Sequence, residues 1–217
     1  MERRLNRACE RTGRPLTGVT LVAITKGFPA SYVREAFSAG VRNLGENRVQ
    51  EAGAKMRDLA DLNPRIVWHM VGRLQSNKVK TATEIFDIIH SVDSYRLAEA
   101  ISARTPFTMP VLVEVNVSGE ATKAGFALNE TRAAVEQISH LRCMDVKGLM
   151  TIAPEVPDPE EVRSLFRQLH SLVQSLGLPH LSMGMSADFE VAVEEGATMV
   201  RIGRAIFGER PVNRSRT

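Results

Sequence analysis

Apolar and polar positions follow two alternating patterns along this chain. Short apolar runs recur along the sequence, and most segments between them carry apolar residues at every third or fourth position. The runs are typical of strands covered on both faces, and the second pattern is typical of amphipathic helices. The predicted strands span residues 19–24, 41–44, 66–71, 86–90, 110–117, 144–150, 180–183 and 198–202.

A helix is predicted before the first strand and after each strand. These helices span residues 2–12, 31–39, 46–62, 75–82, 94–104, 129–141, 160–176 and 187–195, with a last helical turn near Arg204. Ser31 and either Asp93 or Ser94 are expected as N-caps, and Gly40 is expected to end a helix.

Strict alternation of strand and helix predicts a parallel sheet with helical crossovers. Eight such units favour a closed (β/α)8 TIM barrel, a single α/β domain over residues 1–210, with a flexible tail over 211–217. An open doubly wound sheet is the alternative. It would need fewer strands and a G-x-G-x-x-G phosphate loop, which this sequence lacks.

Composition narrows the class of protein. Hydrophobic residues make up 43% of the chain, and no apolar run is long enough to cross a membrane. A net charge of +3 gives no reason to expect nucleic acid as a partner. The start of the chain is charged, unlike a signal peptide, and Cys9 and Cys143 lie far apart. We therefore expect a cytoplasmic protein with free thiols and no metal site.

Lys26 closes the first apolar run, just before Gly27. Because side chains alternate along a strand, it should point the same way as Val22 and Ile24. Desolvation lowers the pKa of a lysine and frees its amine to attack a carbonyl. The other interpretation is a lysine whose amine reaches solvent at a strand end.

The loops after the last two strands predict a phosphate site. Ser182–Ser186 and Arg201–Arg204 each precede a predicted helix, at the barrel end where phosphate is commonly bound. Ser186 offers a hydroxyl, and Gly203 allows close backbone approach. Taken singly, Ser186 is more simply a helix cap and Gly203 a turn glycine. His69, beside Trp68, is interpreted as a hydrogen-bonded structural histidine.

An amine and a phosphate site at one barrel end suggest a phosphorylated aldehyde held as a Schiff base. Two classes fit: pyridoxal 5′-phosphate (PLP), or a sugar phosphate in an aldolase of the Schiff-base class. An aldolase would need an assisting lysine or acid pair, and the sequence leaves that possibility open.

Several motifs resemble the pyridoxal phosphate homeostasis protein family, the YggS/PROSC-like proteins. They lie in order along nearly the whole chain, at residues 22–26, 44–51, 68–78, 147–150, 181–188 and 200–208. The resemblance implies the N-terminal barrel of alanine racemase (PLP fold type III) without its second, β-rich domain. It further implies that the protein holds PLP and supports vitamin B6 and amino-acid homeostasis.

The same resemblance assigns cofactor-binding roles and no catalytic or metal-binding residue. Lys26 would form the Schiff base, Arg201 would face the pyridine nitrogen, and Asn47 and Met185 would line the site. Ser186, Gly203 and Arg204 would bind the phosphate, although the family usually has Thr or Ser where this chain has Arg204. A guanidinium donates hydrogen bonds and cannot accept one, so a ring nitrogen that faces Arg201 would be unprotonated and the cofactor would be a poor electron sink.

A PLP-dependent amino-acid racemase is the alternative function. The racemase takes a catalytic tyrosine from its second domain, whereas the tyrosines here, Tyr32 and Tyr95, lie at predicted helix starts. We therefore expect a carrier of PLP rather than an enzyme. Its expected partners are PLP and apo PLP-dependent enzymes as recipients, with no nucleic acid or membrane, and we expect a monomer.

Overall fold

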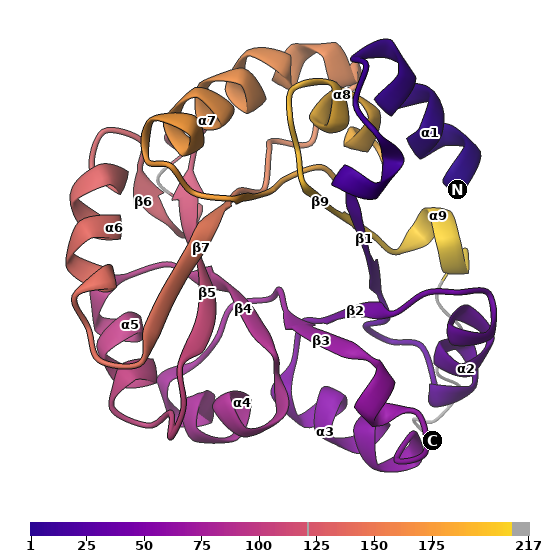
Figure 1. The fold of residues 1–217 in the computed structure, drawn as a ribbon, viewed down its shortest axis with the longest axis vertical. Coiled ribbons are helices and arrows are strands. Elements are labelled where there is room, and N and C mark those ends of the chain that lie inside the picture. The colour runs from indigo at the N-terminus through magenta and orange to yellow at the C-terminus, as the bar shows by residue number, and fades with distance from the viewer. Residues whose placement is uncertain (121, 210–217) are drawn as a thin grey trace.

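The computed structural model describes residues 1–120 and 122–209, which form a barrel of parallel strands surrounded by helices (Figure 1). Its strands are β1 (Thr20–Ile24), β2 (Asn43–Glu46), β3 (Val67–Met70), β4 (Ile88–Val92), β5 (Met109–Asn116), β7 (Met144–Met150), β8 (His180–Ser182) and β9 (Met199–Ile202). The sheet order is β4-β3-β2-β1-β9-β8-β7-β5, and pairing of β4 with β5 closes it. The predicted closed barrel is therefore confirmed.

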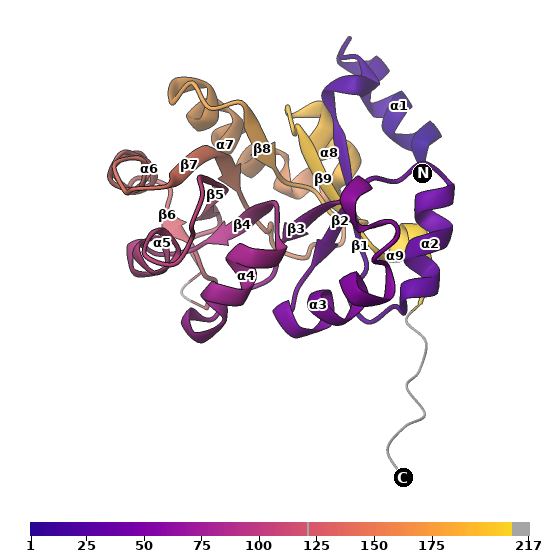
Figure 2. The same ribbon diagram turned by 60° about the horizontal axis from the view of Figure 1, so that its bottom comes forward.

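Helices cover the outside of this barrel on all sides (Figures 1 and 2). They are α1 (Glu2–Arg11), α2 (Ala30–Ser38), α3 (Val49–Asp58), α4 (Val79–Ile85), α5 (Tyr95–Ser102), α6 (Thr131–Ser139), α7 (Arg163–Ser175), α8 (Phe189–Glu194) and α9 (Arg204–Phe207). Short 3-10 helices add η1 (Leu16–Gly18), η2 (Asn63–Arg65), η3 (Ser76–Lys78) and η4 (Pro159–Val162). The predicted tail over 211–217 lies outside the described residues.

The main core lies between the strands and the helices. One face of each strand contributes to it, as Ala23 and Leu44 do in β1 and β2. On the other face, Val22, Ile24 and Val71 form a separate small cluster inside the barrel. Alternation of side chains along each strand thus sends one set of residues to the helices and the other to the barrel interior.

The two predicted N-caps have different outcomes. Ser94 Oγ accepts a hydrogen bond from Leu97 N, which confirms Ser94 as the N-cap of α5. The prediction for Ser31 was wrong, because Pro29 is the N-cap residue of α2. Proline has a fixed φ and needs no donor there, so it can begin a helix without a side-chain cap.

The segment 46–62 was predicted to be one helix, but only Val49–Asp58 is α-helical. Glu46 is instead the last residue of β2, and its side chain is completely buried. A further two-residue strand, β6 (Phe126–Ala127), pairs with β5 inside the loop region that follows that strand. It was not predicted, because two residues are too few to show an alternation.

Candidate functional site

Lys26 lies just beyond the carboxyl end of β1, and its side chain is half-buried. The turn that follows is sharp, since Gly27 has a φ of 78°, in the left-handed region that favours glycine. Val22 and Ile24, two and four residues earlier, face the barrel interior. The structure therefore places the Lys26 residue at the barrel end where the strand prediction put it.

The loops after β8 and β9 meet beside one another. Ser186 Oγ lies 3.4 Å from Ala205 N, in the first turn of α9, and accepts its hydrogen bond. Arg201 N donates to the Gly184 carbonyl at 2.9 Å. Ser186 does not cap α8, because that helix begins at Phe189 with Asp188 as its N-cap residue. The Ser186 hydroxyl and the Ala205 amide thus lie against each other at the start of α9.

Gly203 lies between this contact and the end of β1, the strand that leads to Lys26. A Cβ added at Gly203 would lie 3.2 Å from the Ile24 carbonyl oxygen, tighter than most real contacts. β9 pairs with β1 in parallel, with Arg201 opposite Val22 and Ile202 opposite Ala23. The predicted phosphate loop and the predicted Schiff-base lysine therefore come from adjacent strands that touch at their carboxyl ends.

Arg201 is buried inside the barrel and has two fixed acceptors. Its Nη1 donates to Ser182 Oγ at 2.6 Å and its Nη2 donates to the Thr151 carbonyl at 2.7 Å. Burial lowers the pKa of Arg201 to about 10, and the nearby carboxylates of Glu114 and Asp188 oppose that shift. The guanidinium is therefore still charged at neutral pH, and its planar donors hold one orientation.

A chain of hydrogen bonds continues from Ser182 across the barrel. His90 Nδ1 lies 3.0 Å from Ser182 Oγ, and His90 Nε2 lies 2.9 Å from His69 Nδ1. His69 Nε2 lies 3.0 Å from Asn43 Oδ1. β4 and β8 are not neighbours in the sheet, so the His90–Ser182 bond crosses the interior. This confirms that His69 is hydrogen-bonded on both ring nitrogens.

The donors in this chain can be assigned. Because Arg201 can only donate, Ser182 Oγ accepts from it and is left to donate to His90 Nδ1. His90 Nε2–H then donates to His69 Nδ1, and His69 Nε2–H donates to Asn43. Burial lowers the pKa of His69 to about 3 and that of His90 well below its usual value, so both rings are neutral at neutral pH.

Glu114 adds a carboxyl group to the same interior. It is buried, and burial together with the charge of Asp93 raises its pKa to about 7. The charges of Arg201 and Arg73 oppose this rise. Glu114 is therefore a countercharge for Arg201 that is only partly ionised near neutral pH.

The remaining predicted site residues lie around this end of the barrel. Asn47, half-buried, follows β2, and a Cβ added at Gly72 would lie 2.5 Å from its carbonyl oxygen. Met185 N donates to Asp188 Oδ1 at 2.6 Å, while the residue is 38% exposed. Arg204, the first residue of α9, is also exposed. Backbone atoms of this loop are thus better fixed than the Met185 and Arg204 side chains.

Sequence reasoning missed His90 and Glu114, and it named Ser182 only as the start of a loop. The alternation that places Ile88 inside the barrel also places His90 there, and the same argument applies to Ser182 and Glu114. A polar residue at an inward position of an apolar strand was therefore the available signal. It was missed because each strand was interpreted by its end rather than by its faces.

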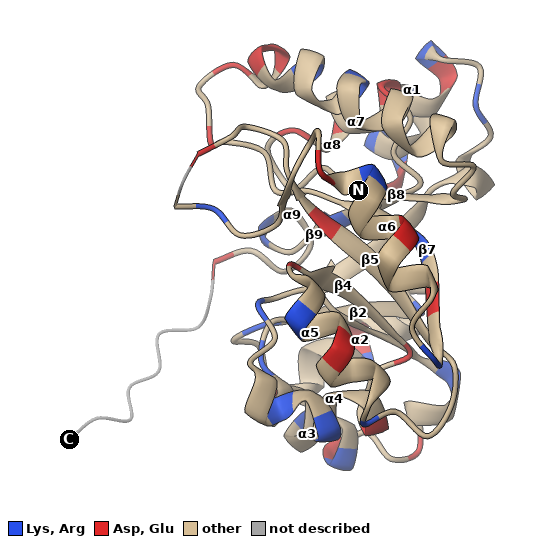
Figure 3. Cartoon of the chain, turned by 90° about the vertical axis from the view of Figure 1, so that its left-hand side faces the viewer, with Lys and Arg blue, Asp and Glu red and all other residues tan. Residues whose placement is uncertain are grey.

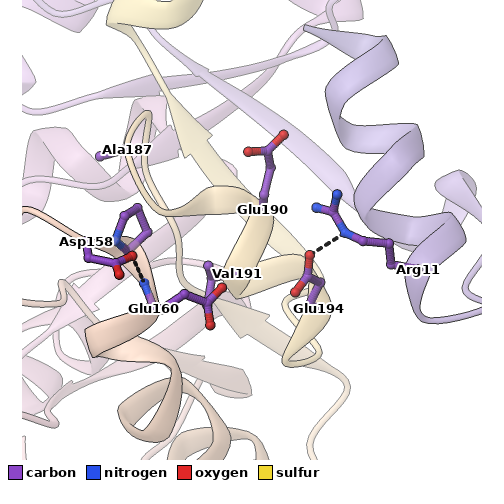
Figure 4. A pocket seen from close by; sticks show the side chains of 8 residues that line it. Arg11, Asp158, Glu160, Ala187, Glu190, Val191 and Glu194 are labelled. Carbon is purple, nitrogen blue, oxygen red and sulfur yellow. Dashed lines mark hydrogen bonds and ion pairs between the residues drawn. The ribbon is translucent and has the colours of Figure 1, made fainter.

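Two grooves lie away from these residues. One, of about 440 Å³, is lined by Arg11, by the carboxylate residues Asp158 just before η4, Glu160 of η4 and Glu190 and Glu194 of α8, and by their neighbours (Figure 4). Arg11 Nε donates to Glu194 there, and Glu160 N donates to Asp158 (Figure 4). The other, of about 410 Å³, lies near the amino ends of β3, β4 and β5. Neither contains Lys26 or Arg201 among its lining residues.

Comparison with known proteins finds one family over nearly the whole chain. Residues 1–211 match the protein-family model for the N-terminal domain of alanine racemase. The pyridoxal phosphate homeostasis protein of Aquifex aeolicus is 45% identical over 216 residues, which cover 95% of this chain and 94% of that protein. That of Vibrio cholerae is 41% identical over 218 residues, covering 96% and 92%.

This chain belongs to the pyridoxal phosphate homeostasis protein family. Among solved structures, the same fold occurs in PipY of Synechococcus elongatus with PLP bound, at 40% identity and a TM-score of 0.82. That match covers 95% of this chain and 99% of PipY. The family membership predicted from the motifs is confirmed.

Alanine racemase shares the fold at greater distance. The enzyme of Corynebacterium glutamicum is 18% identical with a TM-score of 0.69, and the match covers 99% of this chain but 62% of the racemase. At that identity the likeness concerns the fold alone. Over its described residues, this chain consists of the barrel and its surrounding helices.

Proposed function

We propose that this chain binds pyridoxal 5′-phosphate, holds it as a Schiff base on Lys26 and takes part in intracellular PLP and amino-acid homeostasis. One observation carries the proposal. Gly203 joins β9 to α9, where Ser186 contacts the Ala205 amide, and it packs against the end of the strand that leads to Lys26. An amine and an anion site at adjacent strand ends suit a phosphorylated aldehyde. The family's name and the PLP-bound PipY structure support it.

The residues present fit this cofactor. When bound, its aldehyde would supply the carbon that condenses with the Lys26 amine, forming a C=N bond with release of water. The Ser186 hydroxyl and the amides near Gly203 and Arg204 would hold the phosphate, with Asn47 and Met185 beside the ring. The space that a Cβ at Gly203 would take is what allows the backbone to approach an anion.

Arg201 would set the protonation of the ring nitrogen. Its guanidinium already donates to Ser182 and Thr151, so it is held in place before any ligand arrives. A group that only donates keeps the ring nitrogen unprotonated, which disfavours carbanion chemistry. This disfavours aminotransferase-like chemistry. The racemase ranks second for another reason, because the tyrosines of this chain, Tyr32 and Tyr95, lie in helices and do not replace the catalytic tyrosine that the racemase takes from its second domain.

The proposal also covers the recipients of the cofactor, the oligomeric state and the cellular compartment. We propose that apo PLP-dependent enzymes receive the cofactor, that the protein acts as a monomer and that residues 1–210 form its single functional unit. Cys9 and Cys143 are free, which suits the cytoplasm. No helix in the described part of the chain is long and apolar enough to cross a membrane. On the face shown in Figure 3, basic and acidic residues are interspersed over the outer helices.

The first prediction tests the lysine. Purified protein with PLP should show a visible absorbance band that borohydride removes, and mass spectrometry should place the reduced pyridoxyl group on the peptide containing Lys26. Lys26→Ala should lose the band and the adduct while unfolding at nearly the same temperature, since a half-buried side chain at the barrel end leaves no core cavity.

Lys78→Ala is the matched control, because Lys78 ends η3 and should keep both the band and the adduct. An adduct on another lysine, with Lys26→Ala still coloured, would overturn the proposal. Racemisation assays on several amino acids separate the two functions: turnover dependent on Lys26 would favour the racemase.

A further inference from the structure

The turn that carries Lys26 is held from outside the barrel by α3. Lys55 Nζ donates to the Thr25 carbonyl at 2.5 Å. Gly27 N donates to Glu51 Oε1, also at 2.5 Å. The Thr25 carbonyl belongs to the peptide unit before Lys26, and the Gly27 N–H belongs to the peptide unit after it. Both planar peptide units that flank Lys26 are therefore fixed by one helix.

These helix residues form a hydrogen-bonded cluster with Glu46 at the end of β2, in which only Glu46 Oε1 is engaged and Glu46 Oε2 has no hydrogen-bond partner among the described residues. Lys55 Nζ also donates to Glu46 Oε1 at 2.5 Å and to Glu51 Oε1 at 2.9 Å, so its three protons have three acceptors. Thr25 Oγ1 donates to the same Glu46 oxygen. Lys55 is 6% exposed and Glu46 is fully buried. A buried charged cluster is costly unless its members are paired, so a particular geometry is maintained here.

The cluster lies on the helix side of the sheet, opposite to the barrel interior. Leu44, two residues before Glu46 in β2, belongs to the main core, whereas Gly45 faces Val22 and Ile24. Lys55 sits on the buried face of α3 near Val49, Ala52 and Met56. The cluster thus contacts the backbone on either side of Lys26, on the face of the sheet opposite to the barrel interior.

We propose that Lys55, Glu46 and Glu51 are positioning residues that fix the backbone at Lys26 and so aim its amine at the incoming aldehyde. With both flanking peptide planes held, φ and ψ of Lys26 have little freedom, and the direction of its Cβ is set. This inference rests on the proposed function for the reaction it serves. The backbone restraint itself can be measured in the cofactor-free protein.

Glu51 is the member to change, because its side chain is 28% exposed and its loss leaves no empty core space. Glu51→Ala removes the acceptor of the Gly27 amide, whereas Glu51→Gln keeps an oxygen that can accept from both Gly27 and Lys55. Gln50→Ala, the exposed neighbour on the same helical turn, is the matched control. Removing Lys55 instead would strand the buried Glu46 carboxylate and threaten folding.

Two measurements are made on each variant. In cofactor-free protein, hydrogen exchange of the Gly27 amide should become on the order of tenfold faster in Glu51→Ala, as expected for loss of a bond to a charged acceptor. On adding PLP, formation of the borohydride-reducible adduct should slow by about three- to tenfold, since a misaimed amine reacts more slowly. Glu51→Gln should restore both rates, and Gln50→Ala should match the wild type.

The outcomes separate the two proposals. If wild-type protein forms no adduct on Lys26, the proposed function fails while exchange at Gly27 still tests the restraint. If the adduct forms normally in Glu51→Ala, the positioning role is overturned, whatever the exchange rate. Equal slowing in Glu51→Gln and Glu51→Ala would also overturn it, because charge rather than the Gly27 hydrogen bond would then be responsible.

Discussion

At the scale of single residues, Arg201 shows how burial and pairing set the state of one group. Its two donors meet one hydroxyl and one carbonyl, and Glu114 and Asp188 offset part of its desolvation. A lysine at this place has one point charge on a flexible stem and cannot present two parallel donors to both acceptors. The interior therefore requires the shape of a guanidinium as well as its charge.

The second prediction follows from this shape. Arg201→Lys should destabilise the protein by about 1–3 kcal/mol, because at least one buried acceptor loses its donor. Urea unfolding would measure this loss, and the visible spectrum of the PLP-loaded variant should shift. Arg204→Lys, at an exposed position, should change stability by less than about 0.5 kcal/mol. A variant as stable as the wild type would mean that lysine satisfies both acceptors.

At the scale of helices and strands, the effect of replacing a glycine depends on the atoms around it. In β7, a Cβ at Gly148 would lie 1.9 Å from the His180 carbonyl oxygen of the neighbouring strand β8. In α3, a Cβ at Gly53 would meet nothing closer than 3.8 Å. The first glycine allows two strands to pair closely, and the second only adds flexibility to a helix.

The third prediction compares these two positions. Gly53→Ala should stabilise the protein by about 0.5–1 kcal/mol, because alanine has the higher helix propensity and fits the space. Gly148→Ala should destabilise it by more than about 3 kcal/mol, since backbone atoms of β8 must move. Thermal or urea unfolding of both variants checks the signs. Two changes of the same sign would contradict the packing described here.

Strands and helices were largely predictable because their signals are local. The strand 144–150 was predicted with the bounds that the structure has, since apolar residues and Gly148 mark it clearly. Helix bounds failed where a contact elsewhere in the chain decides them. Glu46 looks like the first residue of a helix, yet its backbone pairs with Met70 of β3 and makes it the last residue of β2, while its side chain pairs with Lys55. A lysine on the apolar face of α3 was the only local sign of that pair.

The site was predictable only in part for the same reason. Lys26, Ser186 and Gly203 stand out because each ends a strand or begins a turn, and the fold brings those ends together. The chain through His90 and Ser182 depends on strands that are not neighbours in the sheet, so only the closed barrel reveals it. The alternation of apolar and polar residues along one strand predicts which way a side chain points, but it does not identify the partner of that side chain across the barrel.

At the scale of the whole molecule, the barrel interior contains titratable groups whose pKa values are shifted in ways that affect stability oppositely. His69 and His90 stay neutral because they are buried, while Glu114 stays partly protonated near neutral pH. On unfolding below about pH 6.5, the histidines would take up protons, whereas Glu114 would release one. Their effects on the pH dependence of stability have opposite signs, so the total slope does not report on either group alone.

The fourth prediction isolates His69 by comparing two proteins. The pKa of His69 is about 3 in the folded protein and about 6.5 in the unfolded chain. The folded protein therefore loses stability as the pH falls through that range. His69→Gln removes the proton site, keeps a neutral side chain that can bond to Asn43 and His90, and leaves Glu114 present in both proteins. The difference in unfolding free energy, wild type minus variant, should therefore fall by about 1.4 kcal/mol per pH unit below pH 6.

Urea unfolding at several pH values between 5 and 8 would measure this difference. His140→Gln is the control for the same substitution at an exposed position, because His140 lies on the surface at the end of α6. Parallel stability curves for wild type and His69→Gln would show that His69 binds its proton equally well in the folded and unfolded protein. That result would contradict a neutral hydrogen-bonded chain through the barrel, and with it the assignment of Ser182 as the donor to His90 Nδ1.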